Sequence, residues 1–78
     1  MNIYEVRCSG LCDVNSDPSQ WEVVYVAGRT EDDAASVMQS PWGVAHEKRV
    51  FKAIDTAPEI KRACMVMPPW SYVTEETA

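Results

Sequence analysis

The chain has 78 residues, of which 46% are hydrophobic and 24% charged, a composition typical of a globular domain that excludes an intrinsically disordered chain. This length predicts a single domain with a thin core, because small domains bury only about 60% of the surface that they expose when unfolded. The sequence has no apolar run of the roughly 18 residues that a membrane-spanning helix needs, and the N-terminus lacks the features of a signal peptide. We therefore expect a cytoplasmic protein without a membrane partner.

The net charge of −5 arises in the first half of the chain, because residues 40–78 carry equal numbers of acids and bases. An acidic surface repels nucleic acid and attracts basic protein surfaces, although in most small proteins acidity mainly aids solubility. Against the bases Arg7 and Arg29, residues 1–39 carry seven acids: Glu5, Asp13, Asp17, Glu22, Glu31, Asp32 and Asp33.

The first elements in the chain are two predicted strands. Residues 3–8 alternate between apolar and charged side chains, which predicts a strand with one solvent-facing side. Residues 9–20 are dense in Gly, Pro, Asn, Asp and Ser and predict a long loop, a kind of connection that is often functional. Residues 21–26 are mostly aromatic or β-branched and predict the second strand. The simplest topology pairs the two strands as an antiparallel hairpin.

A short helix follows the second strand. Thr30 and Asp33 have the spacing of a capping box, which predicts that the helix begins at about Glu31. Its apolar residues fall on one small arc, which is expected to lie on the sheet. That arc comprises Ala34, Ala35, Val37 and Met38. The proline in residues 40–43 ends the helix.

The second half of the chain completes the sheet. Residues 49–54 alternate and predict a third strand, with Phe51 and Ala53 on one side. Residues 59–67 fit either a helical stripe or a final buried strand; we favour a strand at residues 62–67, because the third strand otherwise lacks a neighbour along the chain. An edge segment at residues 70–73 is a further option. The predicted fold class is α+β, a small antiparallel sheet of three to four strands packed on one short helix in the order ββαββ.

Few residues could support catalysis or metal binding. Cys8, Cys12, Cys64 and His46 are the potential zinc ligands, but they lack the paired spacing of a zinc site, and an odd number of cysteines suits reduced thiols. Cys64 with His46 is the pair from which a nucleophile and base could be built, although an isolated histidine is more often a surface residue. We therefore expect no cofactor, no metal and no enzymatic activity.

Two surfaces could bind a macromolecule. The first is basic and includes Phe51, and it could bind nucleic acid through stacking, although strand alternation favours Phe51 in the core. Its residues are Lys48, Arg49, Phe51, Lys52, Lys61 and Arg62. The second is the acidic run at residues 31–33, which suits a helix N-terminus and could also present fixed charges beside Asp13, Asp17 and Glu22. Trp42, Trp70 and Tyr72 would be aromatic anchors for a partner if exposed.

The order of these patterns resembles that of small bacteriophage and mobile-element proteins, among them several anti-CRISPR proteins in which an antiparallel sheet wraps one helix. The resemblance covers residues 3–54. It is carried by the strand at residues 21–27, the helix start Thr30-Glu31-Asp32-Asp33-Ala34-Ala35, the pair Trp42-Gly43 and the segment Val50-Phe51-Lys52. It implies a stoichiometric inhibitor that binds a host nuclease or surveillance complex. No binding residue is transferred from this class, whose members share size and acidity more than motifs.

The leading hypothesis is a non-enzymatic phage-type inhibitor in the cytoplasm of an infected bacterial host. It would bind a host CRISPR-Cas effector complex and block DNA binding or nuclease recruitment, as a monomer or homodimer and without binding nucleic acid directly. The residues expected to contact the partner are Asp13, Asp17, Glu22, Glu31, Asp32, Asp33, Trp70 and Tyr72. The alternative is a small nucleic-acid-binding or regulatory module that uses the basic segment at residues 48–62.

Overall fold

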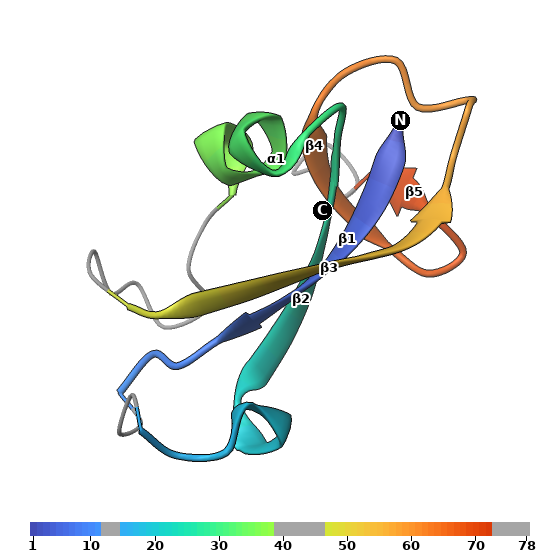
Figure 1. The fold of residues 1–78 in the computed structure, drawn as a ribbon. Coiled ribbons are helices and arrows are strands. Elements are labelled where there is room, and N and C mark those ends of the chain that lie inside the picture. Colours follow the sequence, from blue (N-terminus) through green and yellow to red (C-terminus); the bar gives the residue numbers. More distant parts are fainter. Residues whose placement is uncertain (12–14, 39–46, 73–78) are drawn as a thin grey trace.

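The computed structural model describes residues 1–11, 15–38 and 47–72, which form an antiparallel sheet with one short α-helix (Figure 1). The strands are β1 (Asn2–Cys8), β2 (Glu22–Gly28), β3 (Arg49–Thr56), β4 (Cys64–Met67) and the two-residue β5 (Ser71–Tyr72). The helix is α1 (Glu31–Val37), and a 3-10 turn, η1 (Pro18–Gln20), precedes β2. The predicted α+β class is confirmed. In the described part of the chain, no helix has the length and apolar character needed to cross a membrane.

The strands lie in the order β3-β1-β2-β4-β5, and each neighbouring pair is antiparallel. The predicted hairpin of the first two strands is confirmed, with Tyr4 opposite Val26. The predicted strand near residues 62–67 is also confirmed as β4. However, the expectation that it pairs with the third strand is wrong, because β3 pairs with β1 and β4 pairs with β2.

The connection from β3 to β4 explains this order. It carries Ala57 and Ile60, which are buried together with Ile3 and Ala27 in one hydrophobic cluster. Its start is also tied to the N-terminus, since the Ala57 amide donates to the Met1 carbonyl and the Met1 amino group donates to the Ala57 carbonyl. Burial of these two apolar side chains takes the chain across the sheet and places β4 beside β2 instead of β3.

The sheet is therefore covered on both faces. We call the face beneath α1 the helix face; its core residues are Tyr4, Val6, Cys8, Val26, Ala34 and Met38. The opposite or far face has the core residues Ile3, Ala27, Ala57, Ile60 and Val66. The expectation that one side of the first strand faces solvent is wrong at Ile3, which is fully buried, because the β3–β4 connection covers that end of the far face.

Helix α1 begins at Glu31, as its cap predicted. The predicted apolar arc is only partly correct. Ala34 and Met38 are buried and Ala35 is half-buried, but 38% of Val37 is exposed. The helix has only seven residues, so the part that reaches the sheet is small, and Met38 caps its C-terminus in an extended conformation.

The contact between α1 and the sheet depends on Gly28, the last residue of β2. A Cβ atom at this position would lie 2.6 Å from the Ala34 backbone nitrogen and 2.9 Å from the Ala34 Cα. Real Cβ atoms do not approach other backbone atoms this closely, so any larger residue would push α1 away from the sheet.

We expect Gly28→Ala to lower the free energy of unfolding by about 1 to 3 kcal/mol, the usual range for overpacking a filled contact. Urea denaturation followed by circular dichroism would measure the change. Ala53→Val, which adds bulk at an exposed position of β3, is the control and should change stability by no more than about 0.5 kcal/mol. Equal midpoints for the two variants would contradict the packing role of Gly28.

Candidate functional site

The structure divides the predicted acidic surface into two groups at opposite ends of β2. Asp17 and Glu22 lie at the start of this strand, and residues 31–33 follow its end. The seven residues of β2 separate the groups by about 20 Å. The expected single array of carboxylates is therefore two separate patches in the described residues. Asp13 lies outside those residues.

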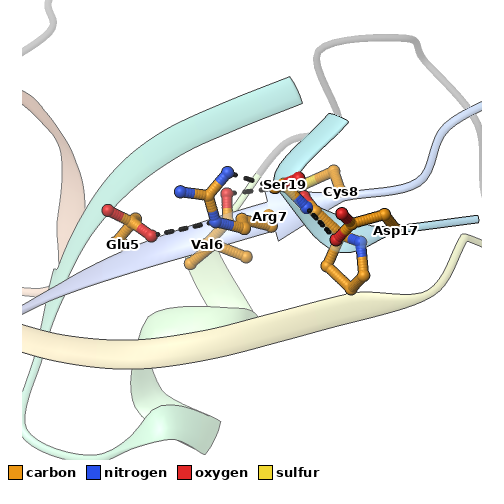
Figure 2. Close-up of polar contacts among 7 residues, drawn as sticks. Glu5, Val6, Arg7, Cys8, Asp17 and Ser19 are labelled. Atoms are coloured by element: carbon orange, nitrogen blue, oxygen red, sulfur yellow. Dashed lines mark hydrogen bonds and ion pairs between the residues drawn. The ribbon is translucent and has the colours of Figure 1, made fainter. Parts of the chain in front are cut away.

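The first patch is built around η1, which is joined to β1 by one polar contact from Arg7 (Figure 2). Asp17 caps η1, because its Oδ1 accepts a 3.0 Å hydrogen bond from the Ser19 amide. The hydrogen bonds from Ser19 hold the pKa of Asp17 below its ordinary value. Arg7 reaches from β1, where its Nε donates to Glu5 at 3.1 Å and its Nη1 lies 3.5 Å from the Pro18 carbonyl oxygen.

The second patch is the first turn of α1. The Thr30 hydroxyl accepts the Asp33 amide at 3.1 Å, and the Asp33 carboxylate in turn accepts the Arg29 amide at 2.9 Å. This is close to the predicted capping box, with the return bond one residue before the cap. Asp33 is half-buried and its carboxylate is hydrogen-bonded at the helix start, whereas Glu31 and Asp32 are exposed. These two carboxylates are therefore presented to solvent on a fixed backbone.

Removing the cap should loosen this patch. We expect Thr30→Ala to lower the free energy of unfolding by about 1 kcal/mol, because the Asp33 amide loses its acceptor. Thr30→Ser keeps the hydroxyl and is the matched control. Chemical denaturation of the three proteins would measure the difference. If serine and alanine were equally destabilising, the cap would not hold α1 in place.

Trp70, one of the predicted anchors, is partly used by the fold. Its ring lies 5.4 Å from the Tyr25 ring on the far face, and its Nε1 donates a 2.6 Å hydrogen bond to Asp55. That bond is the main reason why the pKa of Asp55 is lowered. Trp70 also has a φ of 72°, which is unusual for a bulky residue and is held by these contacts. The half-buried Trp70 thus links the β4–β5 turn to β2 and β3. The backbone of Tyr72 lies in β5, but its side chain is outside the described structure, and Trp42 lies outside the described residues.

A buried carboxylate that was not predicted from the sequence, Glu47, lies just before β3. The Glu47 side chain is fully buried and accepts hydrogen bonds from the Gly10 amide and from Arg49 Nε, each at 3.1 Å. The Glu-x-Arg spacing at the start of a strand was a signal for this pair, because residues two apart share one face. Desolvation, then the charge of Glu47, raises the pKa of Cys8 to about 12. The thiol of Cys8 therefore stays protonated at neutral pH and is a poor nucleophile and a poor metal ligand.

The other candidates for chemistry are not assembled into a site in the described part of the chain. Cys64 is half-buried against the far-face core, and desolvation raises its pKa. Its proposed partner His46, like the proposed zinc ligand Cys12, lies outside the described residues. Residues 1–11, 15–38 and 47–72 contain no cluster of three side chains able to hold a metal ion.

The raised pKa of Cys8 predicts that the protein loses stability at alkaline pH. Folding favours the protonated thiol, so the resulting stability is complete below the ordinary value of 9.0 and is lost as the pH rises toward about 12. Urea midpoints measured between about pH 8 and 10.5 should fall more steeply for the wild type than for Cys8→Ala, which has no group to titrate there. Cys64→Ala is the control and should keep most of the fall. Parallel curves for the wild type and Cys8→Ala would contradict the prediction.

The basic surface has no aromatic ring free for stacking among its described members. Phe51 packs on the helix face, where its ring lies 6.3 Å from the Tyr4 ring at an interplanar angle of 73°. This confirms the interpretation that Phe51 belongs to the core. Arg49 pairs with Glu47, while Lys48 and Lys52 are exposed. Lys61 and Arg62 are exposed in the connection that follows β3.

An apolar groove beside β2 and β4 was also not predicted from the sequence. β4 has four residues and pairs only with residues 25–27 of β2, so it stops short of the start of that strand. We call the resulting hollow of about 380 Å³ the edge groove. It is lined by Val23, Val24, Tyr25, Met65, Val66, Met67 and Pro68. The signal in the sequence was the pair Pro68 and Pro69, which ends β4 early and makes it shorter than β2.

The described structure is thus a small antiparallel α+β protein with two exposed acidic patches and an apolar groove at a strand edge. No family model, no curated protein and no solved structure matches this chain significantly.

Proposed function

We propose that this chain is a non-enzymatic inhibitor that binds a basic surface of a host protein complex. We further propose that the complex is a CRISPR-Cas effector and that the chain acts in the cytoplasm of an infected bacterium, like the phage proteins that it resembles in pattern. The observation that carries the proposal is the pair of exposed carboxylates, Glu31 and Asp32, on the first turn of α1.

The fixed position of these carboxylates supports a role in recognition. Thr30 and Asp33 cap the helix start, and the close contact of Gly28 with Ala34 holds α1 on the sheet. A partner therefore meets charges on a backbone that is already ordered, which lowers the entropy lost on binding. Asp17 and Glu22 place a second acidic patch about 20 Å away along β2.

Negative charges spaced along a rigid frame suit a surface that normally binds nucleic-acid phosphates. With a net charge of −5, the chain is attracted to a basic channel and repelled by free DNA or RNA. Bound in such a channel, it would exclude the nucleic acid or the nuclease recruited to it. The core position of Phe51 also makes this function better supported than nucleic-acid binding, because base stacking needs an exposed ring.

A direct test is affinity capture of effector proteins by the tagged chain, combined with a plasmid-interference assay in cells that express the chain. We expect the chain to recover a CRISPR effector and to reduce interference. A mobility-shift assay should show no binding of the chain to free DNA at physiological salt. Interference that is unaffected by expression of the chain would contradict the proposed function.

The role of α1 can be tested by reversing one charge. We expect Asp32→Lys to weaken inhibition about tenfold, which corresponds to about 1.4 kcal/mol of lost binding free energy. Asp33 is not suitable because it also caps the helix. Glu59→Lys makes the same change of charge at an exposed residue after β3 and is the matched control. Equal inhibition by both variants, with folding checked by circular dichroism, would show that the α1 patch does not contact the partner.

A further inference from the structure

The edge groove lies beside a stretch of β2 that lacks a partner on one side. All seven residues of β2 pair with β1, but β4 pairs only with residues 25–27. Met67 pairs with Ser71 instead, because the chain turns into β5. Figure 1 shows β2, in cyan, continuing beyond the point where β4 turns away. Within the described residues, the backbone edge at residues 22–24 has no neighbouring strand on this side, and Val23 and Val24 line the groove.

The lining of the groove comes from both faces of the sheet. Val23 and Tyr25 belong to the far face, and Val24 belongs to the helix face, as the alternation along β2 requires. Met67 forms part of the wall and is 57% exposed. A hollow lined in this way surrounds a strand edge, so a polypeptide in it could pair with the backbone of β2 and place side chains on either face.

We propose that the edge groove binds an extended segment of a partner protein, which adds a strand beside residues 22–24 of β2. The strand edge fixes the backbone of the occupant as extended, and the lining requires apolar side chains. Glu22 is exposed at the end of this edge, with Asp17 just before it in the chain. A basic residue at the corresponding end of the segment therefore complements the groove.

The β3 edge of the sheet is a poorer place for strand addition. β3 carries Arg49, Lys52 and Asp55, and its register with β1 shifts between Ile3 and Tyr4. Charged side chains and such irregularities discourage strands from pairing at an edge. A second copy of the chain also fits the groove less well, because antiparallel pairing of two β2 edges about Val23 would make the two Glu22 residues diagonal neighbours, about 8 Å apart, on one face.

Binding at the groove does not depend on the acidic first turn of α1 or on the identity of the host complex, and it can be tested with a synthetic peptide. The probe has about eight residues of alternating valine and threonine, a typical strand length, with a lysine at each end. Added to the isotope-labelled full chain, it should shift amide resonances at residues 22–24 and in β4, while β3 stays unchanged. The same peptide with alternate N-methylated amides should not bind, because it cannot pair with a strand.

Three variants test the walls of the groove and its charge. Met67→Asp should weaken peptide binding about tenfold or more, whereas the control Ile54→Asp, at an exposed residue of β3, should change it by less than about twofold. Glu22→Gln should remove the preference for lysine ends over glutamate ends. Amide spectra of each variant establish that the fold is kept.

Several results would overturn the proposal. They are shifts concentrated in β3, equal binding of the N-methylated peptide, or no shift at about 1 mM peptide. The last result would mean that the peptide binds too weakly for recognition. Groove resonances that depend on protein concentration without peptide would mean that a second copy is the occupant. A gain in affinity of about tenfold in a variant ending at Tyr72 would mean that residues 73–78 compete for the groove.

Discussion

Both faces of the β1–β2 hairpin must be covered, and the rest of the described structure follows from this constraint. Tyr4, Val6 and Val26 face one way, while Ile3 and Ala27 face the other. Because the chain is short, each face of the hairpin is covered by a short segment. The seven residues of α1 cover one, and the connection that carries Ala57 and Ile60 covers part of the other. Each piece must lie close to the sheet, which is why Gly28 and Ala34 are in contact.

This division of the core also determines the surface. The β3–β4 connection crosses the sheet to bury Ala57 and Ile60, so β4 arrives beside β2 with only four residues before the prolines turn it away. The start of β2 is left beside the edge groove. The same arrangement places β3 at the opposite edge, where exposed charges and a shift of register protect it.

The charges have a similar origin in the fold. Asp17 and Asp33 each hold a local turn, the first by capping η1 and the second by accepting the Arg29 amide before α1. Glu31 and Asp32, beside Asp33, are exposed. Of these four residues, Asp17 and Asp33 therefore have a structural role, and Asp17 is also exposed as part of the first acidic patch. The proposed inhibitor function depends on the exposed carboxylates of both patches.

The sequence by itself determined the elements. Alternation identified β1 and β3, β-branched residues identified β2, and the Thr30–Asp33 spacing identified the start of α1, because each pattern reflects contacts within a few residues. Tertiary structure alone decided that β4 pairs with β2, that Ile3 is buried, and that Val37 is exposed. It also separated the acidic residues into two patches and created the edge groove. These outcomes depend on distant segments that compete for the same apolar surface. A local sequence pattern does not predict which of these segments packs on that surface.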